Sequence, residues 1–233
     1  MTDALSTIEL VFYAVLSLLV LYLAYHHFRV GLLGWLHLFA FCTLRIVDTA
    51  LSLYATSHAG NSVAIVGLAL LLLATAGILH EVTGSGWTRI CFFHVLVATG
   101  GALAGVGSSS LSEDEQSLSD LQYASAGSAL LTLSWGILAI WAVSSVLKCR
   151  RSKATIASTF ATGTALLYAV CIALIFVGVR VLYALVGLTT WETSLNPVTG
   201  ALPIRVVLEF SPELIVVLLY IFVGLKTRYI IRY

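Results

Sequence analysis

Three ionisable side chains lie four residues apart near the end of the chain, in the otherwise apolar stretch RVVLEFSPELIVVLLY: Arg205, Glu209 and Glu213. In a helix, this spacing places all three on one face. Pro212 follows Glu209 and has no N–H to bond the carbonyl of Leu208, which predicts a bend or a freed carbonyl beside the acids. Because a carboxylic acid in an apolar segment is a candidate general acid, this stretch is the first candidate site.

Two other apolar stretches also carry polar side chains on one face. CTLRIVDTALSLY places Arg45 and Asp48 three residues apart, and FVGVRVLYALVG does the same for Arg180 and Tyr183. Glu9 lies near the start of the first apolar stretch, where it is either part of a site or an interfacial carboxylate that the positive end of a helix dipole favours.

The elements that position these residues are membrane spans. Hydrophobic residues make up 60% of the chain and charged residues 10%, and the mean hydropathy is +1.02. Each apolar run is close to or above the roughly 20 residues that a helix needs to cross a bilayer, and period-two alternation typical of a membrane barrel is lacking. We therefore predict an all-α polytopic membrane protein, with seven transmembrane helices in one bundle and a single domain over residues 1–233. The predicted runs are Ile8–Phe28, Gly34–Ser57, Asn61–Leu79, Thr88–Gly107, Gln122–Leu147, Ser158–Leu188 and Pro203–Leu225.

The basic residues are distributed unevenly between the two sides of the predicted bundle. All but three of them fall in or beside the first, third and fifth connections and the C-terminal segment, which predicts a cytosolic C-terminus and a lumenal or external N-terminus. Net charge near +1 predicts no nucleic-acid partner. The residues on the cytosolic side are Arg29, Arg89, Lys148, Arg150, Arg151, Lys153, Lys226, Arg228 and Arg232.

Four deep polar residues share one half of the bilayer, and a fifth lies near its middle. At about 1.5 Å per residue from the lumenal ends, the depths are roughly 14 Å for Asp48, 12 Å for Arg180, 9 Å for Glu209 and 15 Å for Glu213, and roughly 18 Å for Arg45 near the middle. This coincidence predicts one polar pocket that opens towards the lumen. Two arginines face three carboxylates there, so at least one carboxylate is expected to lack a full partner and to be held in its neutral form, ready to donate a proton.

Three interpretations of the pocket stay open at this point. It is a buried salt-bridge network that fixes helix packing, an enzyme site that protonates a lipid-soluble substrate, or the binding site of a transporter or receptor. The last apolar run has no internal lysine, which excludes a retinal Schiff base. The sequence contains neither an HExxH motif nor a Gly-rich phosphate loop, and it predicts no metal site and no cofactor.

Several aromatic and imidazole side chains indicate a function less specifically than the charged residues do. Trp135 near the middle of the fifth run is either core or the lining of a cavity. His26 and His27 at the end of the first run are predicted to contact lipid headgroups. The third run, which is followed by His80 and Glu81 at the cytosolic edge, is predicted to serve packing only. Gly101 and the residue four positions on, Gly105, have the spacing that lets helices approach closely.

The chain resembles a family of fungal seven-helix integral membrane proteins of largely unassigned function. The segments that carry this resemblance are IELVFYAVLSLLVLYLAY, LRIVDTALSL, VRVLYALVG and LNPVTGALPIRVVLEFSPELIVVLLYIFVGLKTR. The chain is also similar, more loosely, to the fungal membrane-bound terpene cyclases of meroterpenoid pathways. Those small seven-helix enzymes protonate an epoxide or terminal alkene of a farnesyl-type chain, using acids on an early and a late helix.

The resemblance implies a catalytic acid pair made of Asp48 and either Glu209 or Glu213. It further implies a prenylated or terpenoid substrate, a cation guided by aromatic faces without a metal, and a location in the endoplasmic reticulum. The alternative is a non-enzymatic receptor-like or lipid-transport protein that binds a ligand in the same pocket. The residues expected to line the pocket around the substrate are Arg45, Arg180, Tyr183, Trp135, Phe210 and Glu9.

Overall fold

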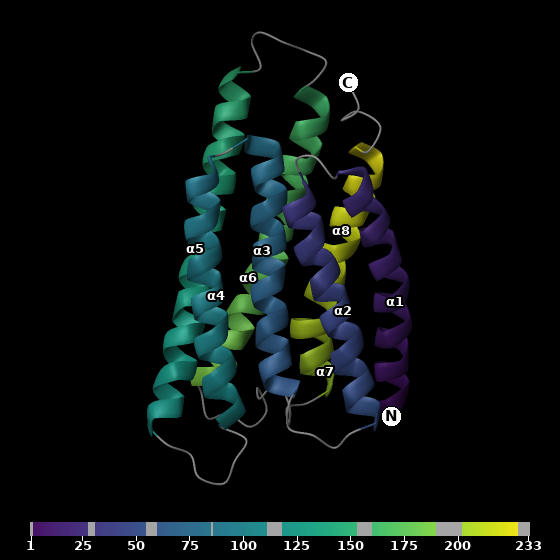
Figure 1. The fold of residues 1–233 in the computed structure, drawn as a ribbon, viewed down its shortest axis with the longest axis vertical. Helices are drawn as coiled ribbons and strands as arrows, with labels where there is room; N and C mark the ends of the chain where they lie inside the picture. Colours follow the sequence, from purple (N-terminus) through teal and green to yellow (C-terminus); the bar gives the residue numbers. More distant parts are fainter. Residues whose placement is uncertain are drawn as a thin grey trace.

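A computed structural model describes residues 2–27, 31–54, 60–84, 86–110, 118–152, 160–189 and 202–227. Within these ranges the chain is all-helical (Figure 1), and seven segments are long and apolar enough to cross a membrane, which confirms the predicted fold class. The last segment is continuous but contains three elements, α7, a π-helical turn η2 and α8. The elements are α1 (Thr2–His26), α2 (Leu32–Tyr54), α3 (Gly60–Thr83), α4 (Trp87–Ser110), α5 (Leu118–Ser152), α6 (Phe160–Thr189), α7 (Leu202–Arg205), η2 (Val206–Phe210) and α8 (Ser211–Thr227).

Successive spans run in opposite directions, so the two termini lie at opposite ends of the bundle (Figure 1). We call the end at which α1 begins the N end, and the end at which α8 finishes the C end. α3 occupies the centre, because it packs against α2, α4, α5 and α6 and is the most buried span. α8 lies against α6 and α1. Large apolar side chains cover the outer faces of the bundle, as a lipid environment requires.

Glycines set the closest helix contacts. A Cβ atom on Gly77 of α3 would lie 2.4 Å from the Cα atom of Gly34 on α2, so these two backbones touch. Gly101 on α4 also faces α3, since a Cβ there would lie 3.0 Å from the Cβ atom of Ala69. The close approach predicted at Gly101 is therefore confirmed. The tighter crossing of α2 and α3 was missed, because its two glycines are far apart in the sequence and form no small-residue motif.

A buried carboxylate ties three helices together at the C end. Glu81 on α3 accepts a hydrogen bond from Trp35 Nε1 on α2 at 3.1 Å, and its other oxygen pairs with His27 Nδ1, just after α1, at 2.6 Å. The His27 side chain is fully buried. The predicted headgroup contact is therefore wrong for His27, because a partner 54 residues away draws the imidazole inside the protein.

Replacement of this histidine gives the first testable prediction. His27→Leu is expected to lower the free energy of unfolding by about 1–3 kcal/mol, because it leaves one oxygen of a buried carboxylate unpaired. Thermal unfolding of the purified protein in detergent measures the change. His26→Leu is the matched control; its partly exposed imidazole packs on the Tyr22 ring, 4.5 Å away between centroids, and a change of about 0.5 kcal/mol or less is expected. Equal losses in both variants would contradict the role given to His27.

Candidate active site

Two arginines and two glutamates from three spans form a closed ring of ion pairs inside the bundle. Arg45 on α2 donates from Nε to Glu213 Oε2 at 2.7 Å, from Nη2 to the same oxygen, and from Nη2 to Glu209 Oε1 at 3.1 Å. Arg180 on α6 donates from Nε to Glu213 Oε1 at 2.8 Å and from Nη2 to Glu209 Oε1 at 3.1 Å. Each arginine therefore contacts both glutamates. We call these four side chains the ion-pair ring.

Asp48 joins the ion-pair ring from one side. Arg45 Nη1 donates to Asp48 Oδ2 at 3.2 Å, as the spacing of three residues on α2 predicts. Side-chain exposure rises from 0% for Glu213 to 6% for Glu209 and 21% for Asp48. Because α2 runs towards the N end, Asp48 lies one turn closer to that end than Arg45. The polar cluster is thus fully buried at Glu213 and partly exposed at Asp48.

The energetic reason for the ring is that a buried charge is tolerated only when it is paired and hydrogen-bonded. Two guanidinium groups balance the two glutamates, and Asp48 adds a third carboxylate to the same group. The five side chains that the sequence placed at one depth lie together in the structure. The sequence did not predict which arginine pairs with which acid.

Glu209 is presented by the π-helical turn η2. The Ser211 N–H bonds to the carbonyl of Val206, five residues back, and the Ser211 hydroxyl donates to the same carbonyl at 2.8 Å. Pro212 accounts for the position of the wide turn, because it supplies no N–H to continue an α-helical ladder. Beside this proline the sequence predicted a bend or a freed carbonyl. The structure shows a π-turn, an irregularity that is frequent at functional sites.

Three buried oxygen atoms beside the ring have no hydrogen-bond partner within the described ranges: Glu209 Oε2 and the hydroxyls of Tyr13 and Tyr183. The Tyr13 ring on α1 packs edge-on against Phe210, with 6.2 Å between centroids. The Tyr183 ring lies 5.7 Å from Arg180 Cζ, as expected for two residues on one face of α6. A buried polar atom without a partner costs about 1–3 kcal/mol, so a hydroxyl, epoxide or water placed here would gain hydrogen bonds.

The other predicted site residues differ in how close they come to the ring. Glu9 is half-buried on α1, within electrostatic range of Arg45 and Glu209. Trp135 on α5 is engaged with α6 instead: its Nε1 donates to the carbonyl of Leu174 at 2.9 Å, and its ring covers Gly178. Of the two interpretations left open for Trp135, the structure supports a helix–helix contact.

Tyr13 and Phe41 are neighbours of the ring that the sequence did not single out. Their rings pack edge-on with centroids 6.0 Å apart, and Arg45 Cζ lies 5.9 Å from the Phe41 centroid. The available signal was helical spacing, because Tyr13 follows Glu9 by four residues and Phe41 precedes Arg45 by four. Throughout the part of the chain that the structure describes, no group of three or more His, Cys, Asp or Glu side chains could hold a metal ion.

The model of a domain of unknown function, DUF7702, matches residues 1–230. The chain belongs to the DUF7702 family. The match covers all seven spans, so the ion-pair ring and its π-turn lie within the DUF7702 domain. No curated protein and no solved structure matches the chain. The function of this DUF7702 protein must therefore be argued from the chemistry of its own site.

Proposed function

We propose that this DUF7702 protein is a membrane-embedded terpene cyclase that starts its reaction by protonation, with Glu209 as the proton donor. The observation that carries the proposal is the unequal pairing of three carboxylates around two guanidinium groups. Glu213 uses both oxygens to accept from both arginines. Glu209 uses only Oε1, while its buried Oε2 has no hydrogen-bond partner among the described residues. A proton on Glu209 balances the charge that Asp48 adds and makes Oε2 a donor.

The reaction that suits such a donor is the cyclisation of a farnesyl-type chain. The proton goes to an epoxide oxygen, whose C–O bond breaks, or to a terminal alkene. Neighbouring alkenes then attack the cation and form carbon–carbon bonds. Asp48 takes up the proton that the final cation loses, so the product is an isomer of the substrate and no proton is consumed. The aromatic faces of Tyr183 and Phe210 stabilise the positive charge, and exclusion of water prevents its early capture.

Two further arguments support this assignment. The resemblance inferred from the sequence implies acids on an early and a late helix, and Asp48 on α2 and Glu209 just before α8 would be that pair. A prenylated substrate also dissolves in the bilayer that the seven apolar helices require. On the same resemblance we propose a location in the endoplasmic reticulum. The excess of Lys and Arg in the first, third and fifth connections and the C-terminal segment supports an orientation with the N end in the lumen and the C end in the cytosol.

The proposal is tested in a yeast host supplied with farnesylated and epoxyfarnesylated aromatic precursors. The unmodified chain is expected to give a new product of the same mass as its precursor. Glu209→Gln is expected to abolish this product, and Asp48→Asn to reduce it, with both variants still accumulating in the membrane. A cyclised isomer that persists undiminished in Glu209→Gln would rule out Glu209 as the donor.

A non-enzymatic receptor-like or lipid-transport protein is the second candidate. It is favoured by the closure of the ion-pair ring, in which both guanidinium groups are already bonded to protein carboxylates. A ligand that needs only a polar partner would tolerate the exchange of Glu209 for glutamine. If no precursor is converted and the amide variants accumulate normally, ligand binding replaces cyclisation as the function of the cluster.

A further inference from the structure

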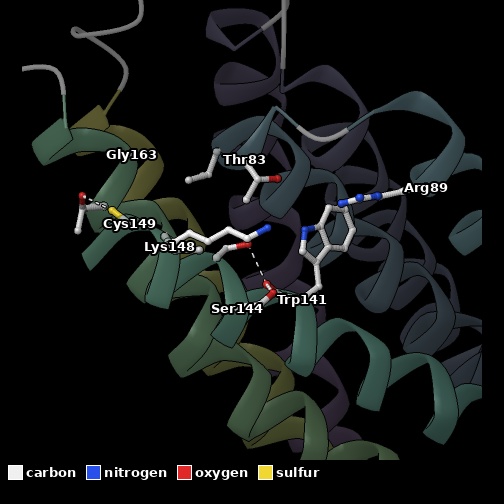
Figure 2. Close-up of a pocket in the computed structure, with 11 residues that line it drawn as sticks. Thr83, Arg89, Trp141, Ser144, Lys148, Cys149 and Gly163 are labelled. Atoms are coloured by element: carbon white, nitrogen blue, oxygen red, sulfur yellow. Dashed lines mark hydrogen bonds between the residues drawn. The ribbon is translucent and has the colours of Figure 1, made fainter. Parts of the chain in front are cut away.

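A cavity of about 460 Å³ lies at the C end, among the ends of four helices (Figure 2). Its walls are the last turns of α3 and α5 and the first turns of α4 and α6. Figure 2 shows the Lys148 side chain extended across the cavity towards the indole of Trp141, with Arg89 beside the same indole. The residues that line it are Val82, Thr83, Arg89, Trp141, Ser144, Ser145, Lys148, Cys149, Gly163, Thr164 and Leu167.

No acidic side chain among the described residues pairs with Arg89 or Lys148, the two cations in this cavity. Five basic residues and one acidic residue, Glu81, are described at the C end; the basic residues are Arg89, Lys148, Arg150, Arg151 and Lys226. Glu81 is already bonded to His27 and Trp35. The sequence stretches that join the helices at this end, 28–30, 85 and 153–159, and the segment 228–233 contain no Asp or Glu. Within the part of the chain that the structure describes, the positive charge of the cavity is therefore uncompensated.

An apolar groove continues from the cavity along the outside of α4 and α5. It has a volume of about 340 Å³ and shares Arg89, Trp141 and Ser144 with the cavity. Its other lining residues are apolar: Phe92, Phe93, Ile137 and Ile140. Phe92 is 69% exposed and Ile140 is 72% exposed, so the groove faces the lipid. A charged compartment at the membrane edge thus joins an apolar compartment that points into the bilayer.

We infer that this cavity and groove bind one phospholipid with an anionic headgroup. Arg89 binds the phosphate through its planar guanidinium group, and Lys148 binds it as a point charge. The indole N–H of Trp141, for which no hydrogen bond is recorded in the described ranges, is the third donor. One acyl chain lies in the groove between α4 and α5. Basic pockets between transmembrane helices are suited to such headgroups.

The site is independent of the proposed proton donor. It lies at the other end of the bundle and shares no lining residue with the ion-pair ring. A lipid bound here bridges α4 and α5 at the C end and places a negative charge beside Arg89 and Lys148.

The test measures lipid binding to the purified full chain in a zwitterionic detergent. Retention of phosphatidic acid is followed by native mass spectrometry, with phosphatidylcholine and inorganic phosphate as comparison ligands. One phosphatidic acid per chain is expected to be retained. Arg89→Gln combined with Lys148→Gln is expected to weaken its binding by about 10- to 30-fold, because each basic residue near a membrane surface contributes about 1 kcal/mol to the binding of an anionic lipid.

The matched control is Arg150→Gln combined with Arg151→Gln. These two arginines are exposed on α5 and line neither compartment, so the control removes the same charge beside the site. Its affinity for phosphatidic acid is expected to stay within about threefold of the unmodified chain. Equal losses in both double variants would overturn the inference, because they would show diffuse attraction to a basic surface.

The groove is tested separately. Ile137→Trp fills it and is expected to weaken the binding of a long-chain phosphatidic acid more than that of a short-chain one. The assignment to an anionic lipid would be overturned if phosphatidylcholine were retained as well as phosphatidic acid. It would also be overturned if inorganic phosphate at equal concentration displaced phosphatidic acid fully. Neither experiment involves Glu209 or Asp48, so its result does not depend on whether the protein is a cyclase.

Discussion

Arg180→Met is expected to lower the free energy of unfolding by about 3–5 kcal/mol, because the loss of one partner from a buried ion pair leaves a charge uncompensated. The Arg180 side chain is 2% exposed, and it donates to Glu213 Oε1 at 2.8 Å and to Glu209 Oε1 at 3.1 Å. Without it, the single guanidinium group of Arg45 faces the charged carboxylates of both Glu213 and Asp48. Methionine preserves the length of the side chain, so the loss is mainly electrostatic. Thermal unfolding in detergent micelles measures the change.

Two controls separate the ion-pair ring from a general effect of charge. Arg205→Met removes an exposed cation from the same region and is expected to change the free energy of unfolding by about 0.5 kcal/mol or less. Glu213→Gln added to Arg180→Met restores the balance of charge, because one guanidinium group then faces one charged carboxylate, that of Asp48, and it is expected to recover part of the lost stability. If Arg180→Met unfolds no more readily than Arg205→Met, the ring does not hold the three spans together.

Glu209→Gln is expected to reduce turnover of the farnesyl-type substrate by about 10²–10⁴-fold, which is the usual contribution of a general acid. It is expected to leave stability nearly unchanged, because glutamine has the shape of a protonated glutamate. The amide oxygen can still accept from both arginines, and the amide nitrogen takes the place of the unpartnered Oε2. Turnover and thermal unfolding are measured on the same preparation.

Glu213→Gln is the matched comparison, because the substitution is chemically identical and one helical turn away. Both oxygens of Glu213 accept from guanidinium groups, so in either orientation an amide NH2 would face another donor. A loss of about 3 kcal/mol is therefore expected for Glu213→Gln, more than for Glu209→Gln. Equal losses in the two variants would show that Glu209 carries no proton, even before any substrate is found.

The seven spans and the convergence of five charged residues could be predicted from the sequence. Helix length fixes how deep a residue lies, and spacings of three and four fix which side chains share a face. Those two rules predicted that five charged side chains lie at similar depths in the bundle: Arg45, Asp48, Arg180, Glu209 and Glu213. The pairing inside the group could not be predicted, because it depends on how each helix is rotated about its axis.

The sequence of this chain gives little indication of how each helix is rotated about its own axis. In a soluble helix the apolar face points inwards, but in a membrane both the lipid-facing and the buried faces are apolar. For the same reason, the contact between Gly34 and Gly77 could not be predicted from the sequence. The hydrogen bonds of Glu81 to His27 and Trp35 could not be predicted either. The π-turn was only half predicted: Pro212 marked the place of the irregularity, but the preference for a wide turn over a bend depends on contacts beyond the local sequence.

The ion-pair ring also has a consequence for the order in which the protein enters the membrane. Arg45 is synthesised together with Asp48, three residues on, so α2 contains its own partial counter-charge. α6 contains no acidic residue, and both partners of Arg180 lie in the final span, 29 and 33 residues downstream. A lone arginine in the bilayer is costly. Transfer of α6 into the lipid is therefore most favourable when α8 enters with it as a helical hairpin, so the last span of the protein governs the insertion of the one before it.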